Sequence, residues 1–294
     1  MKSGFVSIIG RPNVGKSTLI NQIIGRKVAI ISDKPQTTRN NIKGVYNEED
    51  IQIVFVDTPG IHKPVHKLGK HLNRQAYYSI DDVDVILMLV DANDYLGPGD
   101  RYVIDKLKEV TKPVILVLNK IDRMPKEQIL QKIYQYKDLY PFKEIVPVSA
   151  LKNDNVDTLI KVIKTYLTDN VKYYDTDTIT DKPTQFVLSE IVREKVFNLT
   201  DEEVPHSVMC VVEHMESNDD RYLVNVAIIV DRDSLKKIII GAKGSKIKEI
   251  GIKSRQDMEQ LLGKTVYLEL FVKTIEKWRD KEKYLSEFGY NEYE

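Results

Sequence analysis

The sequence lacks the features that mark secreted and membrane-spanning proteins. It contains one cysteine, Cys210, so no disulfide can form within the chain, and this count fits a reducing compartment. Its longest apolar stretch, residues 83–90, is much shorter than the roughly 20 residues that cross a bilayer, and we predict a buried strand there. The opening residues, MKSGFVSIIGRPN, do not have the pattern of a signal peptide. We therefore expect a cytoplasmic protein.

The chain has no net formal charge, because 44 Lys and Arg balance 44 Asp and Glu, but its charges are unevenly distributed. Residues 184–294 carry 17 basic and 21 acidic side chains, whereas residues 236–255 carry seven basic and one acidic. Such a basic segment indicates either a contact with a polyanion or a solvated helix face. The length of 294 residues, with 42% hydrophobic and 30% charged residues, predicts a soluble protein of two domains.

Short runs rich in Val, Ile and Leu alternate with helical patterns over the first 170 residues. The runs predict strands at residues 4–10, 28–32, 51–58, 83–92, 113–120 and 144–150. The helical patterns cover residues 16–25, 100–110, 126–139 and 156–167. Continuous apolar strands suit a parallel sheet that is covered on both faces. We therefore predict a doubly wound α/β domain, with a mainly parallel sheet, over residues 1–170.

A segment rich in Asp and Thr, DNVKYYDTDTITDKP, interrupts this alternation at residues 169–183. We predict that residues 171–183 form a linker, because the segment has no helical face and closes with proline. Residues 184–294 then follow the order α-β-β-α-α-β, with a further helix at the C-terminal end. This order predicts a second, α+β domain.

The glycine-rich stretch GRPNVGKS, residues 10–17, lies between a predicted strand and a predicted helix. It has the G-x-x-x-x-G-K-[ST] spacing of a phosphate-binding loop, in which backbone N–H groups surround the phosphates. In such a loop Lys16 reaches the β- and γ-phosphates, and the Ser17 hydroxyl is a ligand of Mg²⁺. The predicted nucleotide-binding residues here are Gly10, Arg11, Pro12, Asn13, Val14, Gly15, Lys16, Ser17 and Thr18.

Later motifs at strand ends predict that the nucleotide carries guanine. Asp57 in DTPG can hold the Mg²⁺ shell, and the Gly60 N–H can meet the γ-phosphate. Asp122 in NKID can accept two hydrogen bonds from guanine, whereas adenine would leave this carboxylate unpaired. Backbone N–H groups of SAL can bind the guanine oxygen. The predicted residues are Asp57, Thr58, Pro59, Gly60, Asn119, Lys120, Asp122, Ser149, Ala150 and Leu151.

The sequence resembles the translation-factor-like family of small GTPases, whose nucleotide-binding motifs occur in the same order. The resemblance implies that a threonine in PQTTR closes on Mg²⁺ when the γ-phosphate is present. We favour Thr38, with Thr37 as the alternative, so the predicted metal ligands are Ser17, Thr38 and Asp57. The loop around Thr38 and the segment after DTPG would then be ordered by GTP and released after hydrolysis.

Many small GTPases place a water-orienting glutamine directly after the last glycine of the DTPG motif, but Ile61 occupies that position. Asn13 is the candidate replacement, because GTPases with an asparagine there resemble potassium-activated enzymes. The alternative is that Asn13 only stabilises the loop backbone. The predicted catalytic residues are Lys16, Thr38, Gly60 and Asn13, with K⁺ as a further cofactor.

The stretch GAKG, residues 241–244, cannot be a second nucleotide loop, because its glycines are three residues apart and no G-K-[ST] follows. A GxxG turn between two helices in this α-β-β-α-α-β order resembles the KH domain of the second topological type. Such turns clamp about four single-stranded nucleotides. The predicted RNA-binding residues are Ile240, Gly241, Ala242, Lys243, Gly244, Ser245 and Lys246. Ile238, Ile239, Ile240 and Ile247 are either groove wall or core.

A GTPase domain followed by a KH domain, with PQTTR, DTPG and SAL as here, resembles the Era family of bacterial ribosome-assembly GTPases. The resemblance covers essentially the whole chain. It implies binding of single-stranded RNA near the 3′ end of 16S rRNA, a role in assembly and maturation of the 30S subunit, and peripheral association with the inner membrane. We also expect a monomer. The residues alone predict a GTP-controlled binder of single-stranded RNA.

Overall fold

The computed structural model describes residues 1–32, 34, 37–60, 66–201 and 203–290. By its internal contacts the chain divides into two compact units. The first unit comprises Met1–Ala29, Thr38–Pro64 and Leu72–Asp181, and the second comprises Ile30–Thr37, Val65–His71 and Lys182–Glu294.

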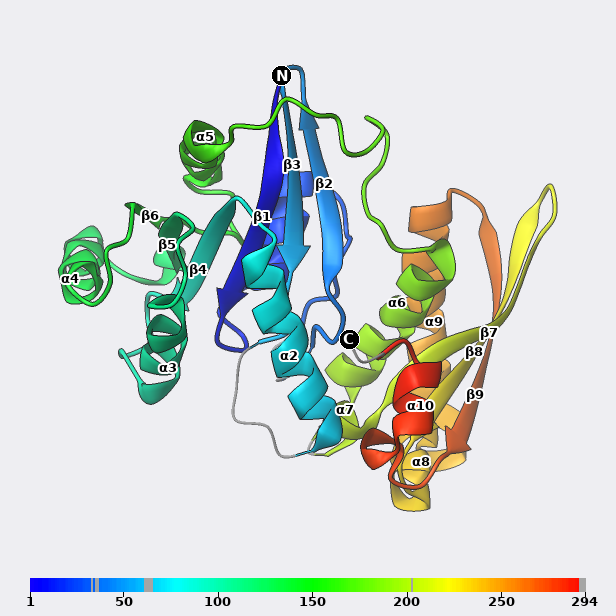
Figure 1. The fold of residues 1–294 in the computed structure, drawn as a ribbon. Coiled ribbons are helices and arrows are strands. Elements are labelled where there is room, and N and C mark those ends of the chain that lie inside the picture. Colours follow the sequence, from blue (N-terminus) through cyan, green and yellow to red (C-terminus); the bar gives the residue numbers. More distant parts are fainter. Residues whose placement is uncertain (33, 35–36, 61–65, 202, 291–294) are drawn as a thin grey trace. The chain divides into compact units, whose positions relative to one another are not determined.

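The first unit is built on a six-stranded sheet with the order β2-β3-β1-β4-β5-β6 (Figure 1). Strand β2 runs antiparallel to its neighbour, β3, and the other neighbouring pairs of this sheet are parallel. The strands are β1 (Lys2–Gly10), β2 (Ile42–Glu48), β3 (Ile51–Asp57), β4 (Val85–Asp91), β5 (Val114–Asn119) and β6 (Glu144–Pro147). Every residue of β3, β4 and β5 is buried, which explains their predominantly apolar sequences.

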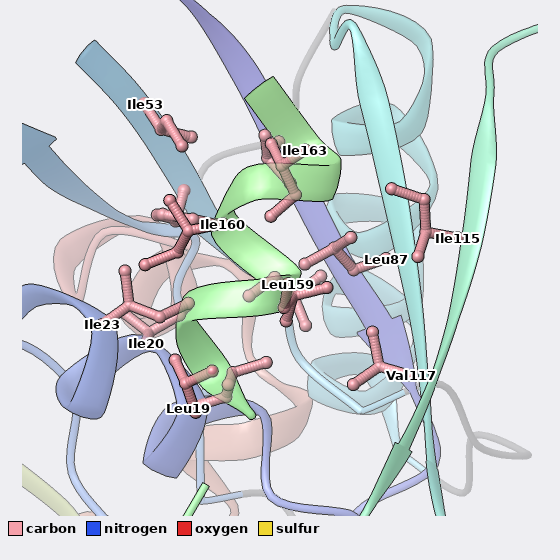
Figure 2. Close-up of a cluster of buried hydrophobic side chains, with 14 of the residues drawn as sticks. Leu19, Ile20, Ile23, Ile53, Leu87, Ile115, Val117, Leu159, Ile160 and Ile163 are labelled. Atoms are coloured by element: carbon pink, nitrogen blue, oxygen red, sulfur yellow. The ribbon is translucent and has the colours of Figure 1, made fainter. Parts of the chain in front are cut away.

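Helices cover both faces of this sheet. The helices are α1 (Lys16–Ile24), α2 (Lys67–Asp81), α3 (Pro98–Leu107), α4 (Lys126–Lys137) and α5 (Val156–Tyr166), with a 3-10 turn at Ile121–Arg123. Figure 2 shows Leu19, Ile20 and Ile23 of α1 beside Leu159, Ile160 and Ile163 of α5. On the other face of the sheet, residues of α2, α3 and α4 form a second apolar cluster with side chains of the strands. The carboxyl ends of the strands, where the sequence motifs lie, are thus fixed by two apolar layers.

Two elements of this unit differ from the sequence prediction. Residues 28–32 form no strand, although Val28 and Ile30 are buried. The Asn21 side chain supplies the hydrogen bonds instead, because its Oδ1 accepts from the N–H of Val28 and Ala29, and its Nδ2 donates to the Ala29 carbonyl. Helix α2 was not predicted, because its sequence follows DTPG, where we expected a nucleotide-ordered segment.

The segment predicted as a linker packs against the first unit over most of its length. The Ile179 carbonyl accepts from the Val45 N–H on edge strand β2, at 2.9 Å. The Gln52 side chain bonds the backbone of Tyr173 and Tyr174 at 2.8–3.0 Å. This contact covers an edge that would otherwise expose unpaired backbone groups. The domain bounds predicted from sequence stay a prediction, and by contacts the first unit extends to Asp181.

The second unit has a three-stranded sheet with the order β7-β8-β9, in which β7–β8 is antiparallel and β8–β9 is parallel. Its elements are α6 (Thr184–Leu199), α7 (Val204–Ser207), β7 (Met209–Ser217), β8 (Arg221–Val230), α8 (Asp233–Ile240), α9 (Ser245–Leu262), β9 (Thr265–Thr274) and α10 (Glu282–Glu287), with 3-10 turns at Ala242–Gly244 and Trp278–Asp280. Helices α6, α8 and α9 share one apolar core with the sheet.

The predicted fold class, a doubly wound α/β domain followed by an α+β domain, is confirmed. The short helix α7 adds to the predicted α-β-β-α-α-β order without changing it, and α10 lies where a further helix was predicted near the C-terminal end. In the described part of the chain, no helix has both the length and the apolar content that a membrane span requires.

Candidate nucleotide site and RNA-binding turn

The phosphate loop connects the end of β1 at Gly10 to the start of α1 at Lys16. Gly15 has a φ of 102°, and a Cβ placed on it would lie 2.2 Å from Asn119 Nδ2. A Cβ on Gly10 would lie 2.4 Å from the Leu89 carbonyl oxygen. Both positions therefore require glycine, for conformation and for space. The two glycines of the motif are thus needed because the loop backbone lies close to Leu89 and Asn119.

Lys16 is buried above this loop. Its Nζ donates to the carbonyls of Arg11 at 3.0 Å and Gly10 at 3.3 Å. Burial lowers the pKa of Lys16 to about 8, although the nearby Asp57 carboxylate raises it. A buried ammonium with only carbonyl acceptors gains much more from an anion such as a phosphate. This environment suits the predicted role of Lys16.

The lowered pKa of Lys16 makes a testable contribution to stability. Between about pH 8 and 10.5, the folded protein binds fewer protons at Lys16 than the unfolded chain does, so its stability rises with pH in this window. Lys16→Met removes this dependence. We expect urea unfolding of the nucleotide-free proteins to show the wild type gaining up to ~3 kcal/mol relative to the variant between pH 7 and 10.5. A difference that does not change with pH would contradict the assignment.

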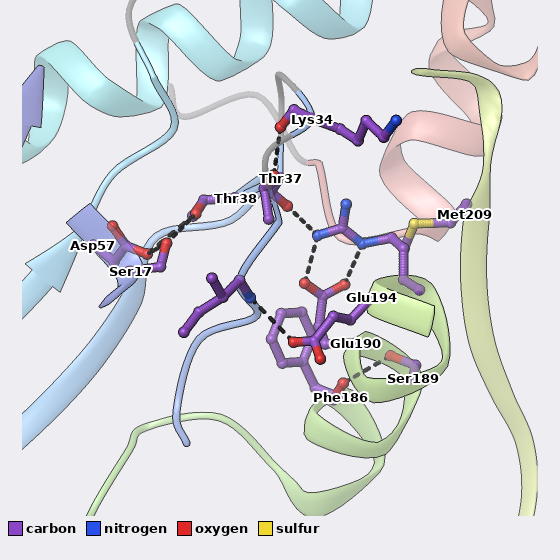
Figure 3. Close-up of polar contacts among 12 residues, drawn as sticks. Ser17, Lys34, Thr37, Thr38, Asp57, Phe186, Ser189, Glu190, Glu194 and Met209 are labelled. Carbon is purple, nitrogen blue, oxygen red and sulfur yellow. Dashed lines mark hydrogen bonds and ion pairs between the residues drawn. The ribbon is translucent and has the colours of Figure 1, made fainter. Parts of the chain in front are cut away.

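The three predicted metal ligands converge beside the loop (Figure 3). Ser17 Oγ and Thr38 Oγ1 lie 3.0 Å apart, and both donate to Asp57 Oδ2, at 2.9 and 3.1 Å. Asp57 is fully buried, and its Oδ1 has no hydrogen-bond partner. Burial raises the pKa of Asp57, against the opposing effects of Lys16, Ser17 and Thr38.

This donor set fits Mg²⁺. Hard oxygen donors, one of them a buried carboxylate, are what this ion prefers, and the orphaned Oδ1 would gain a partner. When bound, Mg²⁺ would supply positive charge that offsets the negative charge of the phosphates. The geometry favours Thr38 over Thr37 as the third ligand, because the Thr37 hydroxyl donates to the Lys34 carbonyl at 2.6 Å. These roles stay predictions.

Gly60 lies against the phosphate loop, and Asn13 is an exposed residue of that loop. A Cβ on Gly60 would lie 2.9 Å from Pro12 N, so the DTPG backbone packs directly against the loop. Asn13 is exposed with a φ of 65°, a conformation that asparagine tolerates well. Both interpretations of Asn13, as a cation ligand or as a loop-stabilising residue, fit this geometry. Ile61 lies outside the described residues.

The motifs predicted to bind guanine meet at the ends of β5 and β6. Asn119 Nδ2 donates to the Val14 carbonyl at 2.8 Å, and its Oδ1 accepts from the Ala150 N–H at 3.0 Å. This buried amide therefore ties together the phosphate loop, NKID and SAL. Asp122 is exposed and accepts from Ser149 Oγ, so its carboxylate is oriented and accessible to a base.

Other predicted residues have supporting positions. Lys120 Nζ donates to the Asn13 carbonyl and lies 2.7 Å from Asp91 Oδ2. The Thr58 hydroxyl donates to the Ile8 carbonyl at 2.7 Å. Of the rest, Val14 and Pro59 are buried, Pro12 and Thr18 are half-buried and Leu151 is exposed. Asp91 was missed by the sequence analysis, although its place at the end of β4 matches that of the other motifs.

Arg11 has a contact that the sequence did not predict. Its Nε donates to Asp100 Oδ1 at 2.8 Å, and its Nη2 donates to Asp94 Oδ2 at 2.9 Å. Asp100 is buried in the first turn of α3, where it also accepts from the Gly97 N–H. This pairing fastens the start of the phosphate loop to α3, and no local sequence signal links residues so far apart.

The GAKG turn joins α8 to α9. Three of its residues, Gly241, Lys243 and Gly244, have positive φ values of 72°, 51° and 79°. A Cβ on Gly241 would lie 2.7 Å from Lys246 Cβ, whereas a Cβ on Gly244 would meet nothing within 4 Å. Ala242, Lys243 and Ser245 are exposed. The turn thus presents backbone and a basic side chain to solvent, which a nucleic-acid backbone could approach closely.

A groove of about 410 Å³ lies between α9 and β9. Its wall combines apolar side chains with basic ones, including Ile247, Ile252, Leu268, Leu270, Lys248 and Arg255. Of the isoleucines predicted as groove wall or core, Ile247 lines the groove, Ile239 is buried in the core, and Ile238 is exposed. The groove has the mixed character that suits nucleotide bases and phosphates.

Comparison with known proteins identifies the family of this chain. A family model described as 50S ribosome-binding GTPase matches residues 5–120, and a KH domain model matches residues 203–279. A crystal structure of Era with MgGDPNP and nucleotides 1506–1542 of 16S ribosomal RNA is 44% identical, with a TM-score of 0.96 over 99% of each chain. The chain belongs to the Era family of GTPases.

A second Era structure supports the same conclusion. A single-residue variant of Aquifex aeolicus Era, bound to GDP·AlF₄⁻, is also 44% identical, with a TM-score of 0.95 over 99% of each chain. The predicted family, the GTPase activity and the presence of a KH domain are confirmed. The chain covers 99% of each of these two relatives, so the similarity includes both units.

Proposed function

We propose that this Era-family chain is a GTP-controlled switch that binds single-stranded RNA at the 3′ end of 16S rRNA during assembly and maturation of the 30S subunit. The main support is the presence, in one chain, of a guanine-type nucleotide site and a basic GxxG turn beside an apolar groove. A similar protein of the family was crystallised with MgGDPNP and this part of 16S rRNA.

In the proposed reaction, the chain's own residues mainly position the nucleotide and offset its charge. Lys16 would neutralise the β- and γ-phosphates, and the Gly60 N–H would hold the γ-phosphate oxygen beside the loop. Ser17, Thr38 and Asp57 would hold Mg²⁺, which spreads the developing negative charge. Asp122 would accept from both guanine donors, with its orientation set by Ser149. Phosphate release would then free Thr38 and its loop.

We propose that K⁺ stimulates hydrolysis through Asn13. The exposed position of Asn13 in the phosphate loop would let its side-chain oxygen bind a monovalent cation beside the phosphates. We expect GTP turnover to be several-fold faster in KCl than in NaCl at equal ionic strength, and Asn13→Ala to remove this difference. Equal rates in the two salts would leave only the loop-stabilising role.

The RNA-binding role of the GAKG turn can be tested by charge reversal. Lys243→Asp is expected to weaken binding of a single-stranded RNA from the 16S 3′ end about tenfold or more, because it places a like charge beside phosphate. GTP turnover should be unchanged. Lys264→Asp is the matched control, since it makes the same charge change beyond the opposite end of α9. Equal losses in the two variants would indicate a general charge effect and would contradict the turn's role.

We propose a cytoplasmic, monomeric protein that associates peripherally with the inner membrane. The basic run at residues 236–255 would attract anionic lipid as well as RNA. Binding to single-stranded RNA and to anionic vesicles, compared at the same salt concentration, separates the two. Preference for vesicles would favour a membrane-signalling GTPase over an RNA switch.

A further inference from the structure

The chain passes between its two units inside the loop predicted to sense GTP. Ile30–Thr37 belongs to the second unit by contacts, whereas Thr38 belongs to the first. Thr38 contacts Ser17 and Asp57 in the predicted metal site. The transition therefore falls at the peptide bond between Thr37 and Thr38.

Helix α6 of the second unit holds the Ile30–Thr37 segment (Figure 3). Arg193 Nη2 donates to the Thr37 carbonyl, and the same guanidinium pairs with Glu190 at 2.6 and 2.7 Å. One turn after Glu190 on the same helix, Glu194 Oε2 accepts from the Ile31 N–H at 3.1 Å. The polar face of α6 thus bonds both ends of the segment.

Burial distinguishes the Arg193 contact with Thr37 from the ion pair that Lys34 of the same segment makes with Asp201. Arg193 is fully buried and Glu190 is 5% exposed, so loss of a partner would leave a charged group without compensation. The Lys34–Asp201 pair on the same segment has an Asp201 side chain that is 83% exposed, and solvent screens it. Arg193 is therefore the contact with the largest influence on the position of Thr37.

The planarity of the peptide bond links the position of Thr37 to that of Thr38. The Thr37 carbonyl and the N–H and Cα of Thr38 share one rigid plane. Arg193 holds the oxygen of this plane, and the Thr38 hydroxyl holds its other end against Ser17 and Asp57. If the Thr38 hydroxyl leaves Ser17 and Asp57, the peptide plane can rotate. Rotation moves the Thr37 carbonyl and so disturbs its hydrogen bond with Arg193.

Helix α6 in turn packs against the helix that starts at the RNA-binding turn. Lys195 of α6 lies 2.5 Å from Asp257 of α9, and both helices contribute to one apolar core. Helix α9 begins at Ser245, directly after GAKG. The contacts from Thr38 through Thr37, Arg193 and α6 to α9 are therefore continuous.

We propose that Arg193 is a positioning residue that couples nucleotide occupancy at Thr38 to RNA affinity at the GAKG turn. This inference rests on the proposed function and adds the residue through which the two sites communicate. Arg193 is not among the residues predicted to bind the nucleotide or RNA. It acts by fixing the Thr37 carbonyl, so its removal uncouples the two ligands while each site keeps its own residues.

The test measures RNA affinity with GDP and with a non-hydrolysable GTP analogue bound. We expect the ratio of the two affinities in the wild type to lie in the range of about 5 to 150 that is typical of coupled sites. Arg193→Met should bring this ratio close to one. Lys34→Met is the matched control, because it removes a cation that serves the same segment through an exposed pair, and it should keep the wild-type ratio.

A second variant covers the case in which Arg193→Met does not fold. The double variant Glu190→Gln/Arg193→Met leaves no unpaired buried charge and should also have a ratio close to one. A folded variant that keeps the wild-type ratio would overturn the role of Arg193, while the proposed function would stand. A wild-type ratio of one with both ligands bound would likewise overturn the coupling. A wild type that binds no RNA in either state would instead refute the proposed function.

Discussion

Replacing Asp57 with asparagine is expected to slow Mg²⁺-dependent GTP hydrolysis about a thousandfold. The change removes the one carboxylate among the predicted metal ligands, and metal stabilisation of the transition state contributes several kcal/mol. Asparagine keeps one side-chain oxygen that can accept from the Thr38 hydroxyl, so the expected loss comes from the missing negative charge. The measurement is single-turnover phosphate release at saturating GTP and Mg²⁺.

The same variant should not be destabilised in the absence of ligands. Burial raises the pKa of Asp57, so ionising this carboxylate costs more in the folded protein than in the unfolded chain, and its negative charge opposes folding. We therefore expect the melting temperature of nucleotide-free Asp57→Asn to equal or exceed that of the wild type. Its RNA affinity should be the same with GDP and with a GTP analogue, which separates a switch from a binding module that GTP merely stabilises.

Asp50→Asn is the control for this substitution. Asp50 is exposed and pairs with Lys164 at 2.7 Å on the surface of the first unit, away from the motifs. It should hydrolyse GTP at the wild-type rate. A hydrolysis rate for Asp57→Asn within threefold of the wild-type rate would remove the argument that these residues hold the metal.

Gly15→Ala is expected to reduce affinity for GDP and GTP at least a hundredfold. The added Cβ would lie 2.2 Å from Asn119 Nδ2, an atom that is itself fixed by the Val14 carbonyl. Relief of this clash must displace either the phosphate loop or the NKID motif, and both are predicted to bind the nucleotide. A displacement of about 1 Å is enough to misalign the N–H groups that surround a phosphate.

Gly25→Ala provides a matched control, because Gly15 and Gly25 flank the two ends of helix α1. Both have positive φ values, 102° and 72°, but a Cβ on Gly25 would meet nothing within 4 Å. Each alanine pays a similar conformational penalty of about 1–2 kcal/mol, visible in thermal melting. Only Gly15→Ala should lose affinity in a titration with fluorescent GDP, and equal affinities in the two variants would contradict the steric argument.

The sequence predicted the elements and motifs that depend on local patterns. Strands β3, β4 and β5 are buried along their whole length, so their apolar runs identify them directly. The phosphate loop is also a local feature, because the glycines, Lys16 and Ser17 act within one strand-loop-helix unit. The GAKG turn is predictable for the same reason, since positive φ values select glycine. Residues 28–32 were mispredicted because Val28, Ala29 and Ile30 are buried without pairing to a strand.

Only the tertiary structure identified contacts between residues far apart in sequence. Arg11 with Asp100, Lys120 with Asp91, and Arg193 with Thr37 each join segments that folding brings together. Charged residues of these types are common on protein surfaces, and sequence carries no signal for which of them will be buried as pairs. The sequence by itself thus determined that the chain has a phosphate-binding loop and a GxxG turn, because each is a local arrangement of backbone. The structure decided which side chains support them, because that depends on how distant segments pack.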